Sequence, residues 1–136
     1  MEKVKKPSIR SFRDLDVYQR SYSAMLRVAK DVIPKLPESE KYRIVDQLCR
    51  SSQAIPRLIA EGYAKRHQRA GFQKYIDDAM AETNETGVSL EQCRDLYGTR
   101  FTPPTCEDLI TPYDILGRQL YKLAVAWRTF AKRNTD

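Results

Sequence analysis

The chain has 136 residues and carries 24 lysines and arginines against 18 aspartates and glutamates, which leaves a formal net charge of +6. A chain of this length is expected to form one domain that buries roughly two-thirds of its unfolded surface. No apolar run is long enough to span a bilayer or has the character of a signal peptide, so we expect a cytoplasmic protein and not a membrane protein. The net charge alone admits nucleic acid, an anionic membrane surface or an acidic protein as a partner.

Residues that carry chemistry are scarce in this sequence. The three cysteines cannot all form disulfides within one chain. Cys49 and Cys93 lie in expected helices, so we expect them to be reduced thiols packed in the core. The single histidine, His67, lies in a charged loop, and no glycine-rich phosphate loop or Glu-x-x-His pair is present. A small hydrolase or metal enzyme would need a carboxylate cluster in the core. The polar residues expected in the core stripe of the third helix are threonines, Thr83 and Thr86, and not carboxylates. We therefore expect no enzyme, no cofactor and no metal site.

The first expected helix begins near Ser11, whose hydroxyl can cap it, with Asp14 favouring its positive end. Pro34 and Pro37 end it. Its apolar residues at spacings of three and four are Leu15, Tyr18, Tyr22, Met25, Ala29 and Val32.

The second expected helix starts near Glu38 and contains an interior proline, Pro56, which costs about 3 kcal/mol unless packing compensates. Its stripe comprises Val45, Leu48, Ser52, Ile55, Ile59 and Gly62. The third helix is expected over residues 70–97, and its stripe comprises Phe72, Ile76, Ala79, Thr83, Thr86, Leu90, Cys93 and Tyr97.

The fourth expected helix is capped by Thr105 or Thr111, with a break near Thr111 because Pro112 suits a first-turn position. Its stripe comprises Leu109, Tyr113, Leu116, Leu120, Leu123, Trp127 and Phe130. Four helices of roughly 20 to 28 residues with short connections predict an all-α, antiparallel up-down-up-down four-helix bundle. We expect a basic flexible arm at residues 1–10 and a single bundle domain at residues 11–133.

Positive charge concentrates at one end of the predicted bundle. The expected topology brings together the amino-terminal arm, the connection between the second and third helices, and the carboxyl end of the fourth. The basic residues there are Lys3, Lys5, Lys6, Arg10, Arg13, Lys65, Arg66, Arg69, Arg128, Lys132 and Arg133. The opposite end holds Glu38, Glu40, Glu107 and Asp108 among fewer bases.

Two arginine triplets recur every seven residues and should lie opposite the apolar stripes. They are Arg13, Arg20 and Arg27 on the first helix, and Arg43, Arg50 and Arg57 on the second. Arginines in a row can contact successive phosphates. Alternatively, exposed helix positions are commonly arginine or lysine, and the regular spacing follows from the heptad itself. Together with Lys65, Arg66, Arg69 and Arg128, these triplets are the candidate nucleic-acid-binding residues. No base-reading module is present, so we expect salt-sensitive phosphate binding; a scaffold for an acidic protein is the alternative.

The segment 47–62 carries a family likeness in its order Gln-Leu-x-Arg, Ile-Pro and Ile-Ala-Glu-Gly. It resembles the signature of the four-helix-bundle family of 23S rRNA intervening-sequence proteins, and residues 12–20 are similar to that family's entry into its first helix. The likeness is weaker after Gly62 and, in the fourth helix, extends only to the apolar pattern. The same broad superfamily includes the accessory variability determinant proteins of diversity-generating retroelements.

The resemblance implies a non-enzymatic homopentamer that binds structured RNA or RNA–DNA intermediates. If the protein acts as a retroelement accessory protein, it would bind them beside a reverse transcriptase. It leaves individual roles open. Arg50 can reach Glu85 across helices or contact a phosphate, and Glu61 can pair with Arg57, meet a helix amino terminus or bind a ligand. Pro56 frees the carbonyl of Ser52 for water or a neighbouring subunit.

Overall fold

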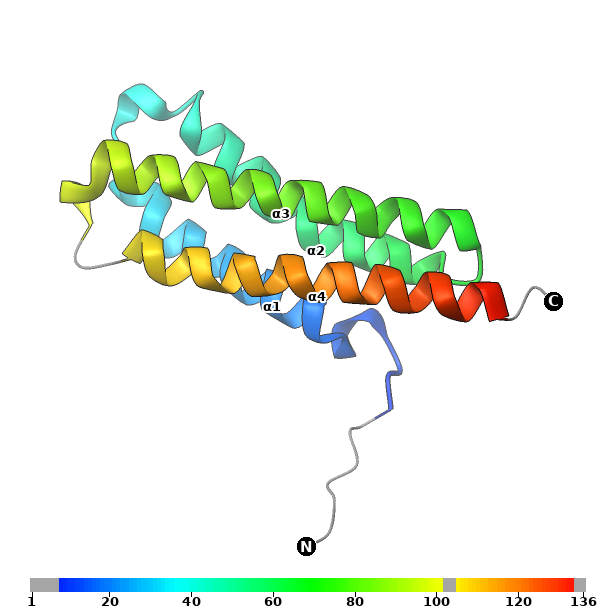
Figure 1. Cartoon of the computed structure of the whole chain (residues 1–136). Helices are drawn as coiled ribbons and strands as arrows, with labels where there is room; N and C mark the ends of the chain where they lie inside the picture. Colours follow the sequence, from blue (N-terminus) through cyan, green and yellow to red (C-terminus); the bar gives the residue numbers. More distant parts are fainter. Residues whose placement is uncertain (1–7, 102–104, 134–136) are drawn as a thin grey trace, which may run out of the picture.

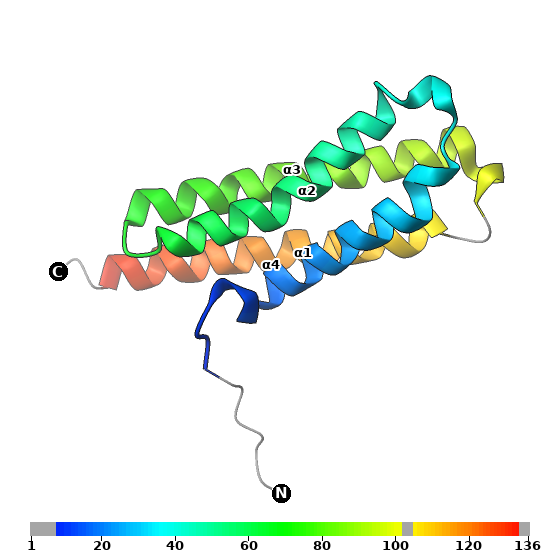
Figure 2. The same ribbon diagram turned by 180° about the vertical axis from the view of Figure 1, so that it is seen from behind.

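The computed structural model describes residues 8–101 and 105–133, with no side-chain description beyond Arg128. It contains four long helices: α1 (Asp16–Arg27), α2 (Ile44–Ala64), α3 (Arg69–Tyr97) and α4 (Thr105–Arg133). Successive helices run in opposite directions along a common axis, and α1 and α2 lie behind α3 and α4 in the first view (Figures 1 and 2). Over the described residues the chain is thus the all-α up-down-up-down bundle that its sequence predicts, without a strand.

The core follows the predicted stripes of the last three helices. Fully buried side chains include Leu48, Ile55 and Ile59 of α2, Ile76 and Leu90 of α3, and Leu109, Leu116 and Leu120 of α4. The stripes of these helices consist mostly of apolar residues at three- and four-residue spacing, so one face of each helix packs into a common centre. The side chain of Phe130 lies outside the described residues.

The predicted stripe of the first helix is wrong in register. Only one residue of that stripe, Val32, is buried. The others are half-buried (Leu15, Tyr18 and Met25) or exposed (Tyr22 and Ala29). The buried face instead comprises Val17, Ser21, Ala24, Val28 and Val32. The Ser21 hydroxyl on this face is satisfied because it donates to the Tyr18 carbonyl at 2.9 Å.

The helix boundaries also differ from expectation. Ser11 caps a turn, as predicted, and forms a capping box with Asp14, but this turn is a single 3₁₀ turn, Phe12–Asp14. The α1 helix begins only at Asp16. A π-helical turn, Val28–Val32, then leads into Pro34. A 3₁₀ turn at Glu38–Glu40 precedes α2, which therefore starts at Ile44 and not at Glu38.

The break expected near Thr111 is absent, because α4 is one helix that contains Pro112 in its eighth position. The arm predicted at residues 1–10 is described only from Ser8 to Arg10, which are exposed.

Two threonine hydroxyls in the core find partners on helix backbones, whereas the buried Tyr113 hydroxyl has none among the described residues. Thr83 donates to the Ala79 carbonyl at 2.7 Å, and the Thr86 hydroxyl lies 2.9 Å from the Glu82 carbonyl. The Thr86 and Ser51 hydroxyls are 2.8 Å apart and join α3 to α2. These two threonines therefore stabilise helix packing, since a buried hydroxyl without a partner costs about 1–3 kcal/mol.

Candidate nucleic-acid interface

The connection between α2 and α3 presents three exposed cations. Lys65 lies with its ammonium 3.2 Å from the Tyr75 hydroxyl and 5.0 Å from the centre of that ring. Arg66 donates to the Tyr63 carbonyl at 2.8 Å, and its guanidinium lies 4.1 Å from the Tyr63 ring centroid. Arg69 is exposed at the first position of α3. Two tyrosines from different helices therefore hold Lys65 and Arg66 in place.

The charge of this cluster is not neutralised locally. In the described part of the chain, no carboxylate lies within 4 Å of Lys65, Arg66 or Arg69. Exposed Arg128 belongs to the carboxyl-terminal part of α4, which ends beside the α2–α3 connection (Figure 1). We call Lys65, Arg66, Arg69 and Arg128 the basic end.

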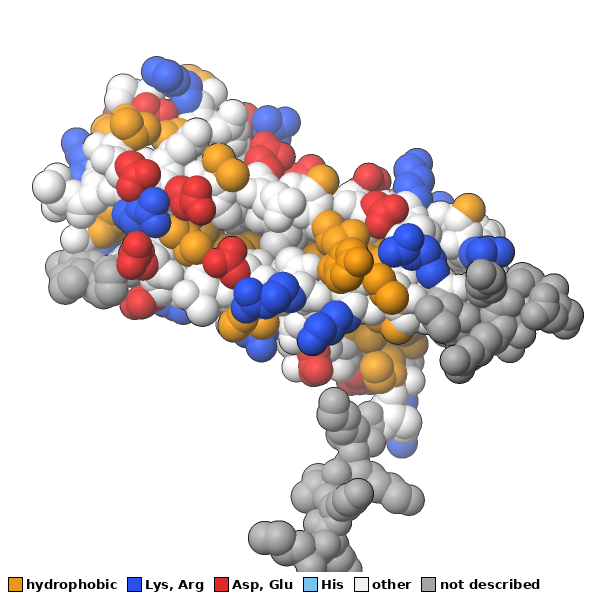
Figure 3. Space-filling view, viewed as in Figure 1, with side chains coloured by type: hydrophobic (Ala, Val, Ile, Leu, Met, Phe, Trp, Pro, Cys, Tyr) orange, Lys and Arg blue, Asp and Glu red, His pale blue; other side chains and the backbone are white. Residues whose placement is uncertain are grey.

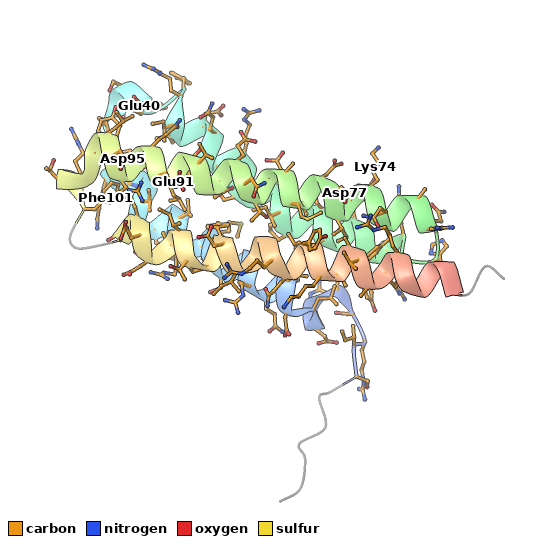
Figure 4. All side chains as sticks on the ribbon, in the orientation of Figure 1. Glu40, Lys74, Asp77, Glu91, Asp95 and Phe101 are labelled. Atoms are coloured by element: carbon orange, nitrogen blue, oxygen red, sulfur yellow. The ribbon has the colours of Figure 1, made fainter. Side chains whose placement is uncertain are left out.

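The surface view supports this polarity. Acidic side chains cluster over the half of α3 and α4 that lies away from the basic end, while lysine and arginine side chains occur along the whole face and include several near the basic end (Figure 3). Glu40, Glu91 and Asp95 lie in that acidic half, and exposed Lys74 projects from α3 in the half nearer the basic end (Figure 4). Lys74 was not among the residues selected from the sequence. The predicted contributions of Lys3, Lys5 and Lys6, and of the Lys132 and Arg133 side chains, fall outside the described residues.

The first arginine triplet does not form one exposed row. Arg13 belongs to the 3₁₀ turn before α1 and lies over the Phe12 ring, 4.4 Å from its centroid. Arg20 is half-buried and donates from Nε to the side-chain oxygen of Gln119 on α4 at 3.1 Å. Arg27 is exposed but has Asp31 at 3.9 Å. The expectation that all three occupy the most exposed helix positions is therefore wrong for Arg20, and Arg13 is not on the helix.

The second triplet is exposed but faces acidic neighbours. Arg43 precedes α2 and lies 3.9 Å from Glu40. Arg50 pairs with Asp46 at 3.2 Å, one turn earlier on the same helix, in place of the interhelical pair considered with Glu85.

Arg57 shares a shallow groove between α2 and α3 with Glu61, Asp78 and Glu82. Burial, followed by the neighbouring Glu85 carboxylate, raises the pKa of Glu82. This surface is therefore mixed in charge and less attractive to phosphate than the basic end.

An apolar groove of about 500 Å³ runs between α1 and α2. It is lined by the α1 residues that the sequence wrongly assigned to the core, among them Tyr18, Tyr22 and Met25, together with buried Pro56 of α2. Tyr22 is 45% exposed and Leu26 is 38% exposed. The α1 helix consequently has two apolar faces, one inside the bundle and one at its surface.

Other chemistry has little support in the described residues. His67 is exposed in the α2–α3 connection, and no three histidine, cysteine or carboxylate side chains lie close enough to hold a metal ion. No described helix is long and apolar enough to cross a membrane. Burial raises the pKa of the Cys93 thiol to about 12, which leaves this cysteine protonated and unreactive at neutral pH.

Residues 13–122 match the model of the 23S rRNA-intervening sequence protein family, a span that includes α1 to α3 and more than half of α4. The chain belongs to this family. The comparison with curated proteins found no match, and neither did the comparison with solved structures.

The family segment 47–62 lies on α2, where its apolar members point into the bundle. Gly62 permits the close approach of α2 and α3, because a Cβ at this position would lie 3.1 Å from the Tyr75 Cβ. Pro56 is buried against α1, and Glu61 is exposed. The segment thus combines core packing with the floor of the α1–α2 groove. Of its two arginines, Arg50 forms an ion pair and Arg57 lines the groove between α2 and α3.

Proposed function

We propose that this 23S rRNA-intervening sequence protein is a non-enzymatic, cytoplasmic protein that binds structured RNA through its basic end. The observation that carries the proposal is the set of exposed cations Lys65, Arg66 and Arg69, which have no carboxylate within 4 Å among the described residues. Tyrosines hold the first two of them in place. Cations on a surface release counterions from a nucleic-acid backbone, and cations without a neighbouring carboxylate bind phosphate without competition from an intramolecular anion. Arginines at such a site also bind phosphate oxygens bidentately.

The arginine triplets extend this surface with smaller contributions. Arg27, Arg43 and Arg50 each have a carboxylate within 4 Å, so a phosphate must compete with that carboxylate. The surface ion pairs are weak, at roughly 0–1 kcal/mol, and phosphate can replace them. We therefore infer a ranking in which the basic end contributes most and the α2 triplet less.

We further propose that the protein acts as a homo-oligomer, with five subunits as its family likeness implies. The exposed apolar groove between α1 and α2 supports association, because Tyr22 and Leu26 remain open to solvent in the single chain. Repetition of the basic end around a ring would raise avidity for a long polyanion without any new contact.

Two RNA partners fit this proposal. The family name suggests an RNA that derives from 23S rRNA, whereas the likeness to retroelement accessory proteins suggests an RNA template, or an RNA–DNA intermediate, beside a reverse transcriptase. Both require the same phosphate-binding surface. A purely protein partner with an acidic surface would use the same cations, and the test below separates it.

The experiment compares two charge-matched triple variants in binding to a structured RNA across a salt series. Lys65→Glu/Arg66→Glu/Arg69→Glu removes the unpaired cations, and Arg43→Glu/Arg50→Glu/Arg57→Glu makes the same change of charge on α2. Loss of about three phosphate contacts should lower the slope of log affinity against log salt by about 2 for the first variant, with a smaller change for the second. Equal effects would contradict the ranking, and absence of RNA binding by the unmodified protein at low salt would refute the function.

A further inference from the structure

A second surface feature, separate from the basic end, lies between α3 and α4. It is a hollow of about 850 Å³, open to solvent, whose floor and walls include Thr83, Asn84 and Gly87 of α3 and Tyr113, Gly117 and Tyr121 of α4. Figure 3 shows hydrophobic side chains on this face, flanked by lysine and arginine side chains. Its size falls in the range of about 300–1,000 Å³ that is typical for small-molecule sites.

The hollow exists because two glycines occupy the middle of long helices. A Cβ at Gly87 would meet nothing within 4 Å, and a Cβ at Gly117 would meet only the Thr83 methyl group, at 3.9 Å. Neither glycine has a positive φ, so alanine would suit either backbone. Glycine inside a helix costs about 0.8–1 kcal/mol relative to alanine. Gly62 offsets this cost by close helix packing, whereas no close contact explains Gly87 or Gly117, and both of these glycines line the hollow.

The chemistry of the walls suits a flat heteroaromatic ring. Tyr121 is 59% exposed and Val88 is 52% exposed, which leaves a bare aromatic face and an aliphatic contact at the opening. Asn84 contributes an amide that can donate and accept at the edge of a ring. An exposed aromatic side chain beside an amide is the combination that binds unpaired nucleobases, by stacking and by hydrogen bonds at the base edge.

Two cations of α4 provide for the phosphate that such a base carries. Arg118 and Lys122 line the same hollow and are exposed. Gln119, which follows Arg118, accepts the hydrogen bond from Arg20, so a third cation lies across α4 on the α1 side. Glu91 and Asp114 also line the hollow, and they limit the positive charge to one part of the opening. A backbone phosphate beside Arg118 and Lys122 therefore leaves its base within reach of Tyr121 and Asn84.

We propose that the hollow between α3 and α4 binds one unpaired nucleotide of RNA, with the base over Gly87 and Gly117 against Tyr121 and its phosphate at Arg118 and Lys122. The inference rests on the proposed RNA binding and deepens it. Phosphate contacts at the basic end supply affinity for any RNA, and the hollow adds a preference for RNA that has an extruded or single-stranded base.

The test uses two RNA hairpins of equal length, one fully paired and one with a single bulged 2-aminopurine. Base–aromatic stacking should make the bulged hairpin bind about five- to 150-fold more tightly, with quenching of its fluorescence on binding. Gly87→Leu fills the hollow and should abolish both the preference and the quenching while binding of the paired hairpin stays unchanged. Gly98→Leu is the matched control, because Gly98 also has open space around it but lies in the turn after α3, outside the hollow.

Other results of this experiment would refute either RNA binding or the nucleotide site, and a melting measurement serves as the folding control. Binding of neither hairpin refutes RNA binding itself, while equal binding of both, or an intact preference in Gly87→Leu, refutes the nucleotide site alone. Competition by free adenosine monophosphate as effective as that by the bulged hairpin would mean that the site takes a free nucleotide. A change of oligomer mass in Gly87→Leu would mean that a second copy of the chain fills the hollow. Thermal melting of Gly87→Leu at or above the unmodified protein's midpoint confirms that the variant folds.

Discussion

Replacement of Gly62 by alanine is expected to destabilise the bundle although alanine is the better helix former. The added Cβ would lie 3.1 Å from the Tyr75 Cβ and 3.7 Å from the Ile76 Cδ1. A Cβ is fixed to the backbone and cannot rotate away, so α2 and α3 must move apart at this position. Overpacking of this kind costs about 1–3 kcal/mol, whereas the gain in helix propensity is about 1 kcal/mol. The net expectation is a loss of about 1 kcal/mol, or roughly 3–5 °C in the melting midpoint.

The assay is urea and thermal unfolding followed by circular dichroism at one fixed protein concentration, because subunit association shifts apparent stability. Gly87→Ala is the matched control, since its Cβ meets nothing within 4 Å. That variant should gain about 0.5–1 kcal/mol from helix propensity and from the reduced entropy of the unfolded chain. If Gly62→Ala proved as stable as Gly87→Ala, the close approach of α2 and α3 would not explain the glycine.

Three further predictions concern single side chains. The Tyr97 hydroxyl donates to Glu40 at 2.7 Å and holds the pKa of that carboxylate below its ordinary value of 4.5. This hydrogen bond therefore stabilises the folded protein above pH 4.5, and the stabilisation is lost as pH falls through the lowered pKa. Tyr97→Phe should therefore flatten the acid limb of a stability–pH curve, and an unchanged limb would contradict this linkage. In a variant whose one cysteine is Cys93, a pKa of about 12 leaves roughly 10⁻⁴ of the thiol ionised at pH 8. Ellman's reagent should therefore label Cys93 about a thousandfold more slowly than a free thiol. Comparable labelling rates would show that the bundle opens around Cys93. Ser11→Ala removes the cap that accepts from the Arg13 amide at 3.0 Å and should cost about 1 kcal/mol in urea unfolding, whereas a loss below about 0.3 kcal/mol would show that the turn folds independently of the bundle.

The fold was predictable because three of the four helices carry a single dominant apolar stripe. On α2, for example, Leu48, Ile55 and Ile59 recur at helical spacing, and each is fully buried. The α1 helix carries two competing stripes, and the larger side chains, including Tyr18 and Tyr22, favoured the wrong one. A tyrosine can remain at a surface with its hydroxyl in water, and small residues such as Ala24 pack well only against a particular neighbour. That neighbour is set by tertiary structure, which spacing alone does not specify.

The candidate interface was predictable to a similar degree. Up-down topology alone places the α2–α3 connection beside the carboxyl end of α4, and hence Lys65 near Arg128. The ion pair of Arg50 with Asp46 follows from their spacing of four residues, a signal that was present in the sequence but was not used. The hollow at Gly87 and Gly117 was not predictable, because it depends on how α3 and α4 align along the bundle.

RNA binding measured across a salt series, with oligomer mass determined in the same buffers, tests the central claim most directly. A stable oligomer that binds structured RNA and loses affinity steeply as salt rises is the predicted result, with most of the salt dependence removed by charge reversal at Lys65, Arg66 and Arg69. A protein that binds no RNA at low salt, or whose affinity is unchanged by those substitutions, would contradict the assignment of the basic end as a phosphate-binding surface.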